Sequence, residues 1–151
     1  MSLPDTIAAR LRLPLIAAPM LRVSGPELVS AACRAGVIGS FPTVNARSAE
    51  ALDAWLTRIE DDCARAEAPV APVCPNIIMR SQPDLLAADV DVLVRHRVPM
   101  VLASVGSPAP IVARLHDVGG VVFADVASMR HAEKAIEAGA RGVGLLGAGA
   151  G

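Results

Sequence analysis

The 151-residue sequence alternates between short apolar runs typical of buried strands and longer runs with helical periodicity. The strands recur about every 20 to 35 residues, which is the spacing of βα units in parallel α/β folds. This repeat constrains the fold more than any other feature of the chain. The predicted strands cover residues 15–18, 37–40, 70–76, 100–104, 121–124 and 143–146.

Turn and capping residues mark the helices between these strands. Ser24 and Glu27 have the spacing of a capping box, while Ser107 precedes a proline expected at the first helical position. Ser128 is the expected N-cap of the last helix. The predicted helices cover about residues 24–36, 48–66, 81–97, 107–118 and 128–138.

The third predicted strand contains two prolines. Pro72 and Pro75 lack the backbone N–H that a central strand donates to its neighbour. We therefore expect regular pairing only at Val73 and Cys74.

Composition limits the class of protein. The chain is 53% hydrophobic and 19% charged, which excludes a disordered tail. Its longest apolar stretch, residues 13–21, is about half of the ~20 residues that a membrane span needs. A formal net charge of −1 gives no footprint for nucleic acid or an anionic membrane. The three cysteines are widely spaced, which indicates neither a disulfide framework nor a zinc site and favours a cytoplasmic location.

Six consecutive βα units fit either a doubly wound parallel sheet or a (β/α)8 TIM barrel of which about the first six units are present. Closed barrels of this class run to roughly 250 residues. If the fold is a barrel, we expect residues 1–151 to be the N-terminal part of a single barrel domain, and the barrel to be incomplete in this chain.

Ligands of either architecture bind at the carboxyl ends of the strands. Pro19 restricts Ala18 to extended geometry and would turn neighbouring backbone groups toward a pocket. Asn76 can hydrogen-bond a ligand or cap the next turn, and Asp125 can do the same or accept from amides of its own loop. The glycine-rich residues 147–151 would let a flat or anionic ligand approach the backbone, or would form a loose end.

Other motifs carry no chemistry. His96, His116 and His131 fall on predicted helices, so no Ser-His-Asp or Cys-His arrangement can be built from them. Residues 142–147 match G-x-G-x-x-G, but they lie along a predicted strand rather than at a strand-to-helix turn. We therefore do not interpret them as a dinucleotide site, and we expect no metal site.

Several segments in collinear order carry a resemblance to a known family. They are residues 15–20, 23–28, 74–78, 96–99, 120–126, 130–135 and 147–151. Together they resemble the nitronate monooxygenase family, formerly called 2-nitropropane dioxygenases, whose fold is an FMN-binding TIM barrel. The resemblance implies a flavoprotein monooxygenase that oxidises alkyl nitronates with O2 to a carbonyl compound and nitrite.

The resemblance also implies which residues bind the cofactor. The expected FMN-binding residues are Ala18, Pro19, Met20, Asn76, Asp125, Gly147, Ala148 and Gly149. The family's catalytic residue and its phosphate-binding loops follow the glycine-rich run. No catalytic residue is therefore expected within residues 1–151; it should lie just beyond Gly151, and the isolated chain should be inactive.

Two alternatives remain open at this stage. One is a related FMN-dependent enoyl-acyl-carrier-protein reductase, which would require a nicotinamide. The other is a non-enzymatic half-barrel that binds a ligand or assembles with another chain. The expected partners are a small nitronate and O2, without nucleic acid or membrane, and a homo-oligomer is compatible with the sequence.

Overall fold

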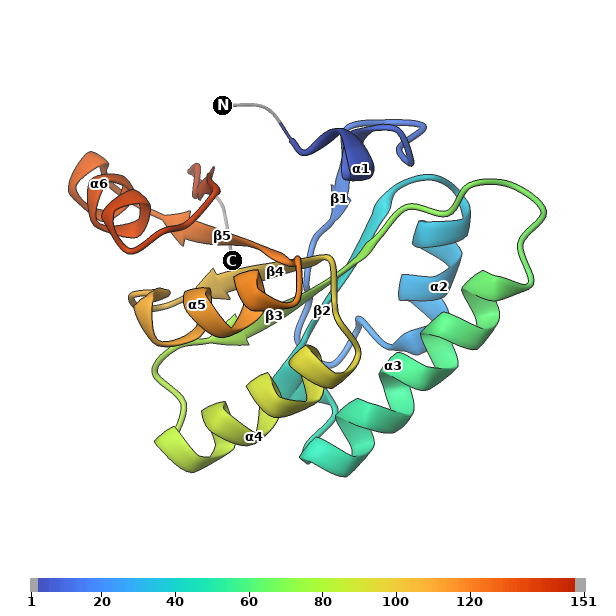
Figure 1. Cartoon of the computed structure of the whole chain (residues 1–151), viewed down its shortest axis with the longest axis horizontal. Helices are drawn as coiled ribbons and strands as arrows, with labels where there is room; N and C mark the ends of the chain where they lie inside the picture. The colour runs from blue at the N-terminus through green and yellow to red at the C-terminus, as the bar shows by residue number, and fades with distance from the viewer. Residues whose placement is uncertain (1–2, 149–151) are drawn as a thin grey trace. The chain divides into compact units, whose positions relative to one another are not determined.

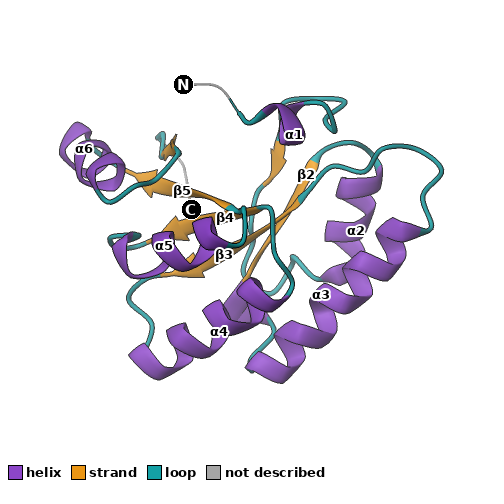
Figure 2. Cartoon of the chain, viewed as in Figure 1, coloured by secondary structure: helices purple, strands orange, loops and turns teal. Residues whose placement is uncertain are grey.

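The computed structural model describes residues 3–148, which fall into two compact units. The N-terminal unit ends at Asn76 and the C-terminal unit begins at Ile77. In both units strands alternate with helices along the chain (Figures 1 and 2). No helix within residues 3–148 is long and apolar enough to cross a membrane.

The N-terminal unit contains three parallel strands in the order β1-β2-β3, counted over the residues described. Ile16 pairs with Ile38, and Gly39 pairs with Val73. Helices α2 and α3 lie side by side (Figure 1). The elements are α1 (Asp5–Ala8), β1 (Ile16–Ala17), α2 (Pro26–Arg34), β2 (Ile38–Pro42), the 3-10 helix η1 (Thr43–Asn45), α3 (Ala49–Ala64) and β3 (Val73–Ile78), which spans the unit boundary.

Large side chains fill the core of the N-terminal unit. Phe41 of β2 is fully buried, and its ring packs against Trp55 of α3 with centroids 5.6 Å apart and planes tilted by 55°. This tilted geometry is favourable for aromatic pairs. Leu52, Leu56 and Ile59 of α3 are also buried.

The C-terminal unit has strands in the order β4-β5-β6, with parallel pairing between β4 and β5 and between β5 and β6. Val101 pairs with Val122, and Ala124 pairs with Val143. The elements are α4 (Pro83–Arg95), β4 (Met100–Ser104), α5 (Ala109–Asp117), β5 (Val121–Val126), α6 (Met129–Glu137) and β6 (Gly142–Leu145).

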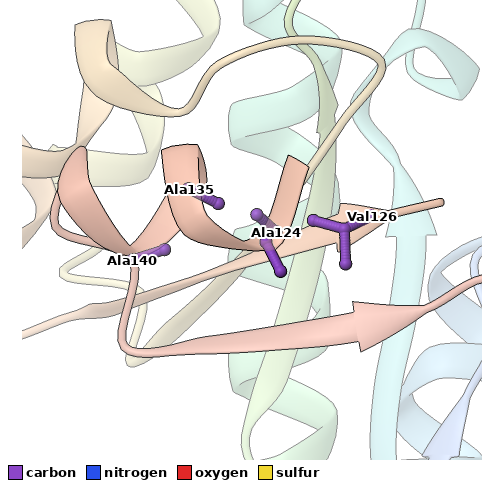
Figure 3. Packing of buried hydrophobic residues seen from close by; sticks show 5 residues of the cluster. Ala124, Val126, Ala135 and Ala140 are labelled. Atoms are coloured by element: carbon purple, nitrogen blue, oxygen red, sulfur yellow. The ribbon is translucent and has the colours of Figure 1, made fainter. Parts of the chain in front are cut away.

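Small side chains fill the space between α6 and the strands of the C-terminal unit. Figure 3 shows Ala124 and Val126 of β5 close to Ala135 of α6 and to Ala140. Ala132 completes this buried cluster, and the half-buried Val143 packs against it. We call these five buried residues the alanine cluster. Because alanine adds only a methyl group, the helix can lie close to the sheet.

All the predicted strands and helices occur within residues 3–148, so the βα repeat is confirmed. Gly36 and Gly139, which follow the C-caps of α2 and α6, have φ values of 79° and 96°, the left-handed region that favours glycine. The sequence did not predict α1 and η1, which are only four and three residues long. Such short segments have too few residues to show a period.

The predicted capping box at Ser24 is wrong. Helix α2 begins at Pro26 with Gly25 as N-cap, and no side chain caps it. The hydroxyl of Ser24 accepts instead from the backbone N–H of Met20 at 3.0 Å. A hydrogen bond from its own backbone and the Arg58 guanidinium, 2.7 Å away, hold the pKa of Glu27 below its usual value.

The other caps are closer to expectation. Ser128 accepts from the N–H of His131 at 3.2 Å, as predicted. Helix α5 begins one residue later than expected, with Pro108 rather than Ser107 as its N-cap. The Ser107 hydroxyl still accepts from the N–H of Ala109 at 3.3 Å.

The expectation that regular pairing of β3 stops at Cys74 is also wrong. The ladder with β2 continues through Pro75, opposite Phe41, to Asn76, opposite Pro42. Proline removes one donor, but its fixed φ lies within the extended range, so the strand keeps its direction.

The predicted strand begins too early, because the backbone before Val73 is bound elsewhere. The N–H of Ala71 donates to the carbonyl of Cys33 at 2.9 Å, and Arg10 Nε donates to the Val70 carbonyl at 2.8 Å.

Candidate functional site

The turn after β1 contains Ala18, Pro19 and Met20, three of the expected FMN-binding residues. A polar network fixes this turn. Met20 N–H donates to Ser24 Oγ at 3.0 Å, and Asn45 Nδ2 donates to the Met20 carbonyl at 3.0 Å and to the Ser24 carbonyl at 2.9 Å. Ser24 is only 2% exposed, so its bonds are shielded from water. We call Ser24 and Asn45 the loop clamp.

The loop clamp also holds a strained backbone. Arg22 has φ 63°, a left-handed conformation that costs energy for residues other than glycine. Its N–H donates to Asn45 Oδ1 at 3.1 Å, which helps to hold this conformation. Sequence reasoning missed Asn45, because its partners lie more than twenty residues earlier in the chain. An asparagine just after the second strand was the only signal available.

This network changes what the turn offers to a ligand. The amide and carbonyl of Met20 both bond to protein groups, so they are not directed toward a pocket as the sequence suggested. The Met20 side chain, by contrast, is 42% exposed. A flat ligand at this turn would therefore meet the thioether and the edge of Pro19 rather than the Met20 backbone groups.

Asn76, predicted as the last residue of its strand, lies inside β3 and is 6% exposed. Successive strand residues point to opposite faces, so Asn76 shares a face with Cys74 and, on β2, with Ser40. The Ser40 hydroxyl donates to the Cys74 carbonyl. This face carries polar groups, whereas Phe41 on the other face packs against α3.

An open groove of about 880 Å³ lies beside the loop clamp. Leu21 to Glu27 and Val44 to Arg47 form most of its walls, and Trp55 completes the lining. None of the expected FMN-binding residues within 3–148 lines this groove. We therefore do not identify it with the predicted cofactor site.

In the C-terminal unit the structure brings together Ser104 and Asp125. Ser104 ends β4, and its hydroxyl donates to Asp125 Oδ2 at 2.6 Å. Asp125 lies within β5, although the sequence placed it just beyond the strand. Both side chains are half-buried. The hydroxyl thus restricts the carboxylate to one orientation at this end of the strands.

The loop after Ser104 is held against the segment that follows β3. Met79 N–H donates to the Ser104 carbonyl at 2.8 Å. Val105 has φ 58° and Gly106 has φ 152°. A Cβ at Gly106 would lie 2.8 Å from Met79 Cβ, so glycine is needed here for this close approach. Positive φ at a β-branched residue such as Val105 is strained.

Gly147 and Ala148 follow β6 and are exposed. Gly149, the last of the expected FMN-binding residues, lies outside the residues that the structure describes. The G-x-G-x-x-G match begins along β6 itself, as predicted, so it does not open a helix.

Other reactive groups do not assemble into a second site. Burial raises the pKa of the Cys33 thiol to about 12, which keeps it protonated and unreactive near neutral pH. The pKa of Cys63 is also raised, first by burial and then by the neighbouring Asp62. Across residues 3–148, no three His, Cys, Asp or Glu residues lie close enough together to hold a metal ion.

Comparison with known proteins shows the fold. No family model matches the sequence, and no curated protein sequence matches it. Among solved structures, a nitroalkane oxidase from Streptomyces ansochromogenes superposes with a TM-score of 0.80 at 22% identity, over 93% of this chain and 48% of that one. FabK from Thermotoga maritima gives a TM-score of 0.76 at 24% identity, over 94% and 43%. DHODH from Eimeria tenella gives 0.63 at 10% identity, over 80% and 47%.

These likenesses and the chain order of the βα units establish the fold class as a (β/α)8 TIM barrel, of which this chain supplies six units within residues 3–148. The chain spans less than half the length of the three structures just named. At this level of identity the comparisons show the fold alone.

Proposed function

We propose that this chain is part of an FMN-dependent oxidoreductase that oxidises alkyl nitronates with O2 to a carbonyl compound and nitrite. The observation that carries the proposal is the likeness to a nitroalkane oxidase over 93% of the chain. The ordered resemblance of the strand ends to nitronate monooxygenases adds to it. A nitronate is the conjugate base of a nitroalkane, so both observations indicate one substrate class.

The residues at the strand ends fit a flat cofactor. Phe123 and Asp125 of β5 lie over Gly142 and Gly144 of β6, where a Cβ would come within 2.3 Å of the Phe123 ring and 2.8 Å of Asp125 Oδ1. The Phe123 ring and the Asp125 carboxylate fill the space that the missing side chains leave, so these two groups, rather than the β6 backbone, would contact a planar ring system. In the N-terminal unit, Pro19 and the exposed thioether of Met20 offer apolar contacts to the same kind of ligand.

FMN, when bound, would supply the redox chemistry, taking electrons from the substrate and passing them to O2. The chain's own residues would bind and orient it. In the N-terminal unit, Met20 would offer the ring an apolar contact and Asn76 a polar one. In the C-terminal unit, Phe123 and Asp125 would offer contacts of the same two kinds. Gly147, Ala148 and Gly149 would let the ligand approach the backbone.

The test uses the product of the complete reading frame that contains these residues. We expect the purified protein to show the visible absorption of oxidised flavin and to release FMN on denaturation. Addition of a preformed alkyl nitronate should consume O2 and yield nitrite without any nicotinamide. Absence of flavin would contradict the proposal.

A second candidate is a reductase of enoyl-acyl-carrier-protein substrates, as the likeness to FabK allows. It predicts oxidation of a reduced nicotinamide by an enoyl thioester and no nitrite from nitronates. The same preparation, assayed with both substrate pairs, distinguishes the two functions.

A further inference from the structure

Strand β5 directs alternate residues to opposite faces, and the two faces have different surroundings. Ala124 and Val126 point toward α6 and belong to the alanine cluster (Figure 3). Phe123 and Asp125 therefore point to the face without α6. There they cross β6 at Gly142 and Gly144, their register partners. Because both partners are glycine, the two side chains lie directly over the neighbouring backbone.

The carboxylate of Asp125 is held from two directions. On one side, Ser104 Oγ donates to Oδ2 at 2.6 Å. On the other side, a Cβ added at Gly144 would lie 2.8 Å from Oδ1. A real Cβ does not approach an oxygen this closely, so Gly144 is required for Oδ1 to keep its place. The position of the carboxylate thus depends on one hydroxyl and one missing methyl group.

We propose that Ser104 and Gly144 position the Asp125 carboxylate as the hydrogen-bond acceptor for an N–H or O–H donor of the bound flavin. This inference rests on the proposed function and deepens it. A carboxylate only accepts hydrogen bonds and repels phosphate, so Asp125 belongs at the donor-bearing part of the ligand. Ser104 and Gly144 are positioning residues, which act through Asp125.

Oxidised flavin offers two sources of such a donor. Its ring system has a single N–H, at the imide N3, and the ribityl chain carries hydroxyl groups. Lumiflavin has the ring without the ribityl chain, and 3-methyllumiflavin also lacks the N–H. Comparing lumiflavin, 3-methyllumiflavin and riboflavin therefore separates the two sources without any phosphate contact.

The experiment measures flavin dissociation constants by fluorescence, using the full-length protein stripped of its flavin, and follows folding by melting temperature. The variants are Asp125→Ala, Ser104→Ala and Gly144→Ala. The last is the sharpest, because it keeps the charge and requires only the end of one side chain to move. Gly25→Ala is the matched control, since its Cβ would meet Glu27 Oε2 at an ordinary 3.5 Å.

We expect Asp125→Ala to weaken binding of the flavin that carries the donor by about tenfold or more, the size of a lost charge-assisted hydrogen bond. Ser104→Ala and Gly144→Ala should lose part of this affinity with unchanged melting temperatures, and Ser104→Thr, which keeps the hydroxyl, should recover it. Gly25→Ala should bind as the parent does.

If N3–H is the donor, the parent should prefer lumiflavin to 3-methyllumiflavin, and Asp125→Ala should lose that preference. If a ribityl hydroxyl is the donor, the loss should appear with riboflavin and not with lumiflavin. If the three variants fold and bind every flavin as tightly as the parent does, the inference is overturned but the proposed function is not. A parent protein that binds no flavin would overturn the proposed function as well.

Discussion

The two units of this chain use different kinds of hydrogen bond near the ends of their strands. In the N-terminal unit, side chains bond to backbone: Ser24 and Asn45 engage the amide and carbonyl of Met20. In the C-terminal unit, a side chain bonds to a side chain, since Ser104 orients Asp125. The first arrangement fixes a loop and uses up its polar groups. The second keeps a charged group at the strand end in one orientation.

The cores of the two units differ in the size of their side chains. The N-terminal unit packs large residues, including Phe41 against Trp55, whereas small residues separate α6 from β5 in the C-terminal unit. Loss of volume should therefore damage the first unit, and gain of volume the second. Substitutions of each kind test this difference between the two cores.

The largest expected effect is at Phe41. Phe41→Ala should lower the free energy of unfolding by about 3–5 kcal/mol, because it removes a fully buried ring and leaves a cavity. The matched change, Ala135→Leu, should cost about 1–3 kcal/mol by overpacking the alanine cluster. Urea denaturation measures both. A smaller cost for Phe41→Ala than for Ala135→Leu would contradict the contrast between the two cores.

The loop clamp should come next. Asn45→Ala removes two donated bonds and one accepted bond, so we expect a loss of about 2 kcal/mol and faster proteolysis within residues 18–24. Asn45→Asp keeps the acceptor for the Arg22 N–H but loses both donors, and should fall between Asn45→Ala and the parent. An unchanged proteolysis rate for Asn45→Ala would show that the clamp does not hold the turn.

Alkaline pH should weaken the N-terminal unit through a buried thiol. Burial raises the folded-state pKa of Cys33 to about 12 from 9.0, so folding favours the protonated form. The stabilisation is complete below pH 9 and is lost as the pH rises toward 12, by about 1.4 kcal/mol per pH unit. Between pH 8 and 10, unfolding free energy should fall less in Cys33→Ala than in the parent. Parallel pH profiles would exclude Cys33 as the cause.

The smallest effects should be equal in the two units. Ser48 caps α3 by accepting from Ala51 N–H, and Ser128 caps α6 by accepting from His131 N–H, each at 3.2 Å. Ser48→Ala and Ser128→Ala should each cost about 1 kcal/mol. Thermal unfolding measures both, and Asp at either position should retain most of the stability. A difference well above 1 kcal/mol would show that surroundings outweigh cap geometry.

The periodicity of the sequence was enough to predict the βα repeat, because burial on one helix face or on both strand faces leaves a local pattern. The loop clamp left no such pattern. Asn45 bonds to Met20 and Ser24 across more than twenty residues, and only the folded chain brings them together. The same holds for Ser104 and Asp125, whose pairing depends on strand register.

The errors also have physical causes. The capping-box pattern at Ser24 and Glu27 is local, but Ser24 gains a buried partner in Met20 that a cap would not provide. The prolines of β3 lower the odds of a strand, yet Pro75 sits in register opposite Phe41. In both cases tertiary contacts outweighed a valid local preference.

The alanine cluster has a consequence for the entropy of folding. A leucine or tryptophan side chain that is buried gives up rotamers, whereas alanine has none to lose. The close contact between α6 and β5 therefore restricts few side-chain rotamers, those of Val126 among them, while it orders the backbone. The N-terminal unit must offset a larger entropic cost through the greater apolar area of Phe41, Leu52 and Leu56.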